Sequence, residues 1–351
     1  MNATAPKLGF ASDYMEGAHP DLLARLADTN LIPAAGYGAD EFSESARAKI
    51  RAACCAPDAD IYFLAGGTQA NAVVLDALLA PYQGVIAADT GHIAGHEAGA
   101  IEHGGHKVIT VPHASGKLTA AQVDACARSW EQDANREHIV MPGAVYISQP
   151  TEHGTLYSLA ELEDIARACR EHRLAFYVDG ARLAYALAAD ANDVALADLA
   201  RLADAFYIGG TKCGALLGEA VVFPEHGRVP GFFSIVKQHG ALLAKGRVVG
   251  VQFDALFTDG LYGRVGRTAV EAADRIRAAL AELGYEQPMV APTNQVFVAL
   301  DDARAASLAE KVDMGFWERT DDGRTIMRLA TSWAVRDEDV DALIGFLREN
   351  A

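Results

Sequence analysis

Positive charge and cysteine are both scarce in this chain. Its 351 residues include 30 Lys and Arg against 47 Asp and Glu, which gives a formal net charge of −17. Because nucleic acids and anionic membranes attract basic surfaces, this balance argues against both as partners. The five cysteines are an odd set without a CxxC pair, as expected for a protein of the reducing cytoplasm.

Long apolar runs and the common phosphate-binding patterns are also absent. No uncharged stretch approaches the length of a membrane span, and the first residues, MNATAPKLGF, contain no apolar signal core. Neither GxGxxG nor GxxxxGK[ST] occurs, so neither a dinucleotide-binding fold nor a P-loop is indicated. We therefore expect a cytoplasmic protein that holds any anionic ligand with a few local groups.

Strand and helix patterns alternate between about residues 60 and 230. Apolar runs such as DIYFLA are each followed by an amphipathic helical pattern. This alternation predicts an α/β fold with a mostly parallel sheet and helices on both faces. After it, two long helical segments lead into a compact α+β region. We expect a large domain over residues 15–255 and a small C-terminal domain over residues 256–351, to which residues 1–14 also belong.

Chemically reactive residues follow the predicted strands directly. In parallel sheets, ligands bind beyond the carboxyl ends of the strands. The residues at these ends are Gly66, Gly67 and Thr68, His92, Thr151 and Glu152, Asp179 with Arg182, and Lys212. Lys212 stands alone in the apolar, glycine-rich stretch DAFYIGGTKCGALLG, where its surroundings can lower its pKa and make it nucleophilic enough for a Schiff base.

Three of these features together indicate a pyridoxal 5′-phosphate site. A buried carboxylate at Asp179 needs a cation, and a protonated pyridine nitrogen is one such partner. In GGTQAN, Gly67 and Thr68 open a helix whose free N–H groups favour a phosphate. Each feature alone has an ordinary alternative: a helix cap for Asp179, a simple turn for the glycines, and a snorkelling side chain for Lys212.

The motifs and their order resemble those of a known family. They are FASDYMEGAHPDLL, GYGADEF, GGTQAN, HIAGHEAGA, DGARLA, GGTKCGALLGEAVVF and MRLATSW, and they cover nearly the whole chain. The chain resembles the threonine aldolase and β-eliminating lyase family of pyridoxal-phosphate enzymes, and within it the low-specificity L-threonine and phenylserine aldolase branch. The resemblance implies the aspartate-aminotransferase-like fold, known as fold type I. It also implies cleavage of L-threonine and related β-hydroxy-α-amino acids to glycine and an aldehyde.

The resemblance also implies roles for individual residues. Lys212 would carry the cofactor as a Schiff base, Asp179 would pair with its pyridine nitrogen, and His92 would stack on its ring. The other expected cofactor contacts are Gly67, Thr68, Arg182, Thr211 and Arg247. The expected substrate contacts are Ser12, Tyr37, His96, Arg182 and Arg328, of which Ser12, Arg182 and Arg328 would hold the carboxylate. Because Tyr37 and Arg247 match positions that line a neighbouring subunit's site, we expect a homodimer, usually paired into a tetramer.

The base for the β-hydroxyl proton is not identified by sequence. Many aldolases of the family carry THN in the loop after the YISQ-like strand, whereas this chain has TEH, with Glu152 in place of the histidine. His153 can compensate for the missing histidine. The candidates for a catalytic base are therefore Glu152, His153, His92, His96 and Glu97, or a water. Histidine suits the role because its unperturbed pKa lies near neutrality.

Three other functions remain open at this point. The same scaffold supports β-elimination or transamination, which Lys212 and Asp179 do not distinguish from aldol cleavage. HIAGHE, followed by His103 and His106, is a pattern from which zinc sites are built, although its order is not HExxH. A binding protein without catalysis is disfavoured, because both the lysine and the aspartate are present.

Overall fold

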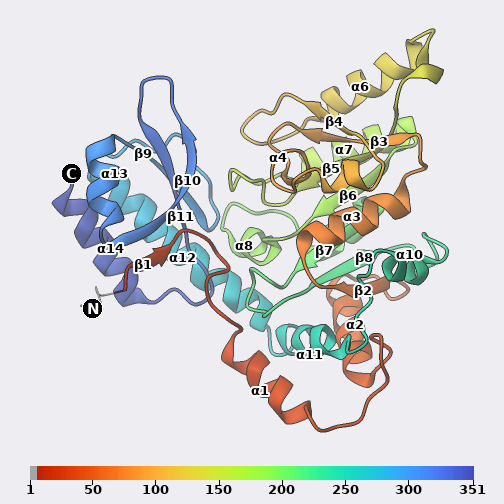
Figure 1. Cartoon of the computed structure of the whole chain (residues 1–351), viewed down its shortest axis with the longest axis horizontal. Coiled ribbons are helices and arrows are strands. Elements are labelled where there is room, and N and C mark those ends of the chain that lie inside the picture. Colours follow the sequence, from red (N-terminus) through yellow and green to blue (C-terminus); the bar gives the residue numbers. More distant parts are fainter. Residues whose placement is uncertain (1–5) are drawn as a thin grey trace.

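Two β-sheets organise the structure, a computed structural model that describes residues 6–351 (Figure 1). The strands of the larger sheet are β2 (Asp60–Leu64), β3 (Gln83–Ala88), β4 (Val108–Val111), β5 (Met141–Ser148), β6 (Ala175–Asp179), β7 (Ala205–Gly209) and β8 (Glu219–Phe223). They lie in the order β2-β8-β7-β6-β5-β3-β4. Neighbours from β4 to β7 pair in parallel, whereas β8 is antiparallel to both β7 and β2. The predicted mostly parallel α/β sheet is confirmed.

Helices cover both faces of this sheet. They are α1 (Pro20–Thr29), α2 (Glu41–Ala53), α3 (Gly67–Leu78), α4 (His92–Gly95), α5 (Ala100–His103), α6 (Ala120–Gln132), α7 (Leu159–His172), α8 (Leu183–Ala188), α9 (Leu196–Leu202), α10 (Phe232–Gln238) and α11 (Arg247–Leu256), with a 3-10 turn at Arg136–His138. Side chains alternate along β6, so Phe176 and Val178 join the core beneath α6, α7 and α11, whereas Ala175 and Tyr177 join the core beneath α3 and α10.

The smaller sheet is built from both ends of the chain. Its strands β1 (Leu8–Phe10), β9 (Gln295–Leu300), β10 (Val312–Arg319) and β11 (Thr325–Ala330) lie in the order β1-β10-β11-β9. The helices α12 (Leu261–Glu282), α13 (Asp302–Ala309) and α14 (Asp337–Glu349) complete this region. Helix α12 packs on α8 at one end and on α14 and β9 at the other, so it connects the two regions (Figure 1). The division between residues 255 and 256 stays a prediction.

The structure differs from the sequence-based expectations in three places. The expected long helix after residue 230 is interrupted between α10 and α11. The segment HIAGHEAGAIEHGG, whose pattern predicts a helix after the strand GVIAAD, forms only the single turns α4 and α5. Between them Ala98 and Gly99 both have positive φ, which no helix accommodates. Strands β1 and β10 were not expected from the sequence. Within residues 6–351, no helix is long and apolar enough to cross a membrane.

Candidate active site

Lys212 lies where β7 ends, among buried groups. Glycine is required here, because a side chain on Gly209 would collide with the carbonyl group of Ala181. The Lys212 Nζ lies 5.9 Å from the centre of the Tyr14 ring. Burial lowers the pKa of Lys212 and the Arg182 charge lowers it further, while nearby carboxylates oppose the shift. The amine is thus more easily deprotonated than an exposed lysine, as a nucleophile requires.

Asp179 lies at the end of β6, where four donors surround its carboxylate. Oδ1 accepts from the Tyr207 hydroxyl at 2.5 Å and from the Ala181 N–H at 2.9 Å. Oδ2 accepts from the Tyr146 hydroxyl at 2.7 Å and from the Asn71 amide at 3.0 Å. Burial alone would raise the pKa of Asp179, but the neighbouring His92 and the hydrogen bonds from Tyr146, Tyr207 and the Ala181 N–H lower it overall. The carboxylate is therefore held ionised, and it can pair with a cationic ring nitrogen.

His92 is held by a buried carboxylate. Its Nδ1 lies 2.7 Å from Oε1 of Glu97, and the same oxygen accepts from the Asn71 amide at 2.7 Å. The Tyr177 hydroxyl donates to the Asn71 side-chain oxygen at 2.9 Å, which fixes the orientation of the amide. Oε2 of Glu97 is buried without a hydrogen-bond partner. Asn71 therefore joins Glu97 and Asp179 in one network, a role that sequence reasoning missed.

The two predicted carboxylate-binding arginines differ in what they already bind. Arg182 donates to Asp13 from Nε at 2.6 Å and from one Nη at 3.1 Å, so most of its fork is occupied. Asn294 donates to the same Asp13 carboxylate at 2.9 Å. Arg328 binds only neutral oxygens, those of Gln295 and Ala11, and its Nε is buried without a partner. Arg328 is thus better placed than Arg182 to take an added carboxylate, and half-buried Ser12 is next to Asp13 in the chain.

The start of α3 offers a cradle for an anion. The helix begins after Gly66 without a side-chain cap, so its first N–H groups are free for a ligand. A Cβ on Gly67 would lie 2.9 Å from the Tyr207 hydroxyl, the same hydroxyl that binds Asp179. Thr68 is exposed at this helix start, and the Thr211 hydroxyl accepts the N–H of Gly218 at 3.0 Å. An amine, a carboxylate and an anion cradle together fit pyridoxal phosphate.

The TEH loop contributes two residues with different surroundings. Oε1 of Glu152 accepts from the Ser148 hydroxyl at 2.7 Å and from the His92 backbone N–H at 3.1 Å, and burial raises the pKa of Glu152. Glu152 thus supports the first turn of α4. The His153 ring lies 5.1 Å from that of His113, and burial lowers the pKa of His153. His96, one turn after His92, has its ring centre 5.7 Å from that of His92.

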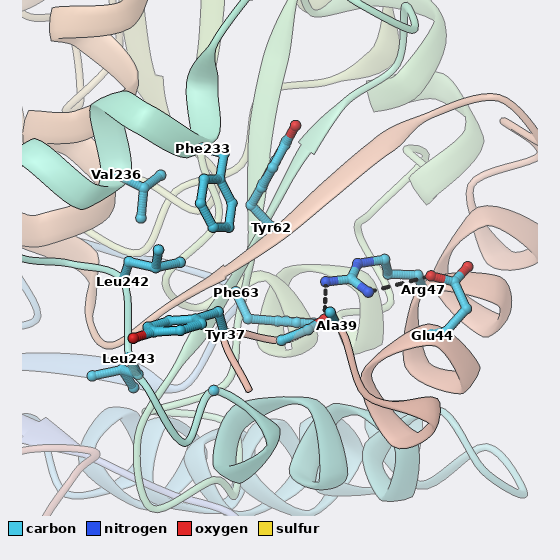
Figure 2. A pocket seen from close by; sticks show the side chains of 12 residues that line it. Tyr37, Ala39, Glu44, Arg47, Tyr62, Phe63, Phe233, Val236, Leu242 and Leu243 are labelled. Atoms are coloured by element: carbon cyan, nitrogen blue, oxygen red, sulfur yellow. Dashed lines mark hydrogen bonds and ion pairs between the residues drawn. The ribbon is translucent and has the colours of Figure 1, made fainter. Parts of the chain in front are cut away.

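Tyr37 and Arg247 lie apart from these groups within one chain. Tyr37 lines an open pocket of about 430 Å³ together with Phe233, Val236 and Leu242 (Figure 2). The Arg247 guanidinium instead donates to the carbonyl oxygens of Thr29 and Ile32 at 2.5 Å each. Their assignment to a neighbouring subunit's site stays a prediction.

Within residues 6–351, the histidines of HIAGHE belong to no cluster of the three or more ligands that a zinc site requires. His103 and His106 lie at and beyond the end of α5, and His106 Nδ1 bonds to the Gln83 carbonyl at 3.1 Å. Among the described residues, no group of three or more histidines, cysteines and carboxylates could hold a metal ion.

Comparison with known proteins identifies relatives along the whole chain. A low specificity L-threonine aldolase of Pseudomonas sp. (strain NCIMB 10558) is 30% identical over 342 residues, covering 97% of this chain and 96% of that protein. A second, of Pseudomonas aeruginosa, is 30% identical over 347 residues with the same coverage. The solved structure of Leishmania major threonine aldolase has a TM-score of 0.95 at 41% identity, covering 99% of this chain and 100% of that one.

More distant structures share the fold. An aspartate aminotransferase of Thermus thermophilus has a TM-score of 0.72 at 16% identity, covering 98% of this chain and 92% of that one, which confirms the predicted fold. The family model described as beta-eliminating lyase matches residues 10–303. The chain therefore belongs to the beta-eliminating lyase family, as its motifs predicted.

Proposed function

We propose that this chain is a pyridoxal-phosphate-dependent lyase that cleaves L-threonine and related β-hydroxy-α-amino acids to glycine and an aldehyde. One observation carries the proposal: the Lys212 amine, the Asp179 carboxylate and the uncapped start of α3 lie at one end of the large sheet. The two Pseudomonas relatives and the Leishmania structure, all named as threonine aldolases, support the same reaction.

Residues at the carboxyl ends of the large sheet's strands would hold the cofactor. Lys212 would attach it through the amine, Asp179 would keep its ring nitrogen protonated, and His92 would stack on its ring. Gly67, Thr68 and Thr211 would bind its phosphate. When bound, pyridoxal phosphate supplies an electron-withdrawing ring that stabilises negative charge at the substrate Cα.

The substrate is oriented by the groups beside Lys212. Arg328 binds its carboxylate, with Ser12 nearby, and Arg182 contributes from its pair with Asp13. A carboxylate held at a fixed point determines which Cα bond is aligned for cleavage, and alignment of this kind lowers the barrier substantially.

His92 is the group best placed to remove the β-hydroxyl proton. Glu97 bonds to Nδ1 of His92 and thereby leaves Nε2 as the free ring nitrogen. Glu152 supports this arrangement, since its carboxylate accepts the backbone N–H of His92. As the hydroxyl proton is removed, the Cβ–O bond becomes a carbonyl and the Cα–Cβ bond breaks, which releases the aldehyde. The electron pair of the broken bond stays at Cα, and a proton added there completes glycine.

Product analysis tests the reaction class directly. Purified holoenzyme is incubated with L-threonine, and glycine, acetaldehyde, ammonia and keto acid are measured together. Glycine and acetaldehyde in equal amounts are the expected products. Ammonia with a keto acid would instead identify β-elimination, and a keto acid formed only with an amino-group acceptor would identify transamination.

We further propose that two copies of this chain associate around the Tyr37 pocket. Tyr37 is 46% exposed and Phe233, which lines the same pocket, is 50% exposed, and an apolar hollow with exposed aromatic side chains is typical of an interaction surface. A second copy that covers this surface would also allow Tyr37 and Arg247 to contact the active site of the partner subunit. Sedimentation of the wild type and of Phe233→Asp tests this: we expect a dimer or tetramer that the substitution weakens, and a monomeric wild type would refute it.

A further inference from the structure

Trp317 lies at a β-bulge in β10. The pairing of β10 with β11 shifts between Phe316 and Glu318, so Trp317 has no paired residue in β11. Such β-bulges redirect a side chain and are common beside active sites. Neither β10 nor Trp317 was predicted from the sequence.

The Trp317 indole reaches residues of the large sheet's ligand-binding edge. Its ring centre lies 5.7 Å from that of His153 and 6.3 Å from that of His96. The Phe297 ring of β9 packs edge-on against the indole, with the two ring centres 4.9 Å apart. The indole is only half-buried, so part of it is open to a ligand.

This aromatic cluster lies beside the groups expected to bind the substrate. The Arg328 guanidinium carbon is 5.9 Å from the centre of the indole. Besides burial and His92, the charges of Arg328, Arg182 and Lys212 lower the pKa of His96, so His96 shares their surroundings. An amino acid whose carboxylate binds Arg328 would therefore have its side chain close to the indole.

We propose that Trp317, together with His153 and His96, forms the wall that contacts the substituent on the substrate Cβ and favours a planar aromatic group over a methyl group. The inference rests on the proposed function. Aromatic rings attract one another in edge-on or offset arrangements with centres about 4.5–7 Å apart, and they bury a large apolar area. A methyl group gains little from such a wall.

Binding of amino acids that cannot be cleaved tests this wall separately from catalysis. Glycine, L-alanine and L-phenylalanine are titrated into holoenzyme, and the absorbance of the bound cofactor is followed. We expect Trp317→Ala to weaken L-phenylalanine binding by roughly tenfold and to change glycine binding by less than about twofold. The ratio of kcat/KM for L-phenylserine over L-threonine should fall by a similar factor.

Three further variants complete the test. Trp317→Phe keeps an aromatic ring and should retain most of the preference for L-phenylalanine, whereas Trp317→Leu keeps apolar bulk without a ring and should lose it. Phe316→Ala, at the neighbouring residue that is 68% exposed, is the matched control and should leave all three affinities unchanged.

Two outcomes would overturn the inference in different ways. If Trp317→Ala and Trp317→Leu weaken glycine and L-phenylalanine equally, the tryptophan acts through Arg328 or the fold and not through the substituent. If no amino acid changes the spectrum of the wild type, the proposed function itself fails, and the wall fails with it.

Discussion

Asn71 is expected to be the residue on which the geometry of the site depends most. Its amide donates to Glu97 at 2.7 Å and to Asp179 at 3.0 Å, and all three residues are buried. Asn71→Ala would remove one donor from each carboxylate. Hydrogen bonds to charged groups contribute about 1.5–3 kcal/mol each, so the free energy of unfolding should fall by about 3–6 kcal/mol.

Urea denaturation of the holoprotein, followed by circular dichroism, measures this loss. Tyr177→Phe removes only the hydroxyl that holds the Asn71 oxygen, so it should cost about 1 kcal/mol. Asn135→Ala, at an exposed position, should change the stability by less than about 0.5 kcal/mol. We also expect Asn71→Ala to weaken cofactor binding, because Asp179 loses a fixed position. Equal stability losses in Asn71→Ala and Asn135→Ala would refute the reasoning.

Three more variants have defined outcomes. Asp13→Asn leaves the Arg182 charge buried and unpaired, which should cost about 3–5 kcal/mol at pH 7 in urea denaturation. Although burial opposes it, the pair with Arg182 lowers the pKa of Asp13 from 3.8 to about 2. The stabilisation from the pair is therefore present above pH 4 and decreases below it, so the loss of stability in Asp13→Asn relative to wild type should be smaller at pH 3. Burial, reinforced by Asp179, raises the pKa of Glu219 from 4.5 to about 8, so the stability of the wild type decreases as pH rises between these values. Glu219→Gln should lose this dependence, and stability curves of the variant and the wild type that run parallel with pH would contradict it. Glu97→Gln should reduce kcat by roughly tenfold or more and alter the pH profile of kcat, because His92 loses its carboxylate partner; an unchanged profile would exclude this role.

The large sheet could be predicted because its strands are apolar on both faces. Runs such as AFYVD and AFYIG are buried throughout and stand out from the helical patterns around them. Strand β1 has only three residues, and β10, VDMGFWER, neither alternates regularly nor forms an apolar run. Both depend on pairing between residues far apart in the chain, which a local pattern does not record.

The candidate site also contains residues that the sequence identifies and residues that it does not. Lys212 and Asp179 could be identified because each lies at or shortly after the end of a strand that the sequence reveals. Asn71 and Asp13 could not, because their roles come from contacts with residues 26 to 281 positions away. A faint signal existed for Asn71, a polar residue within the apolar face of GTQANAVVLDAL.

Borohydride reduction of the holoprotein, followed by peptide mass spectrometry, tests the central claim most directly. The account predicts a pyridoxyl group on Lys212 of the wild type, and no labelled lysine and no cofactor colour in Lys212→Ala. A label on another lysine, or a wild type that stays colourless and unlabelled after addition of pyridoxal phosphate, would contradict it.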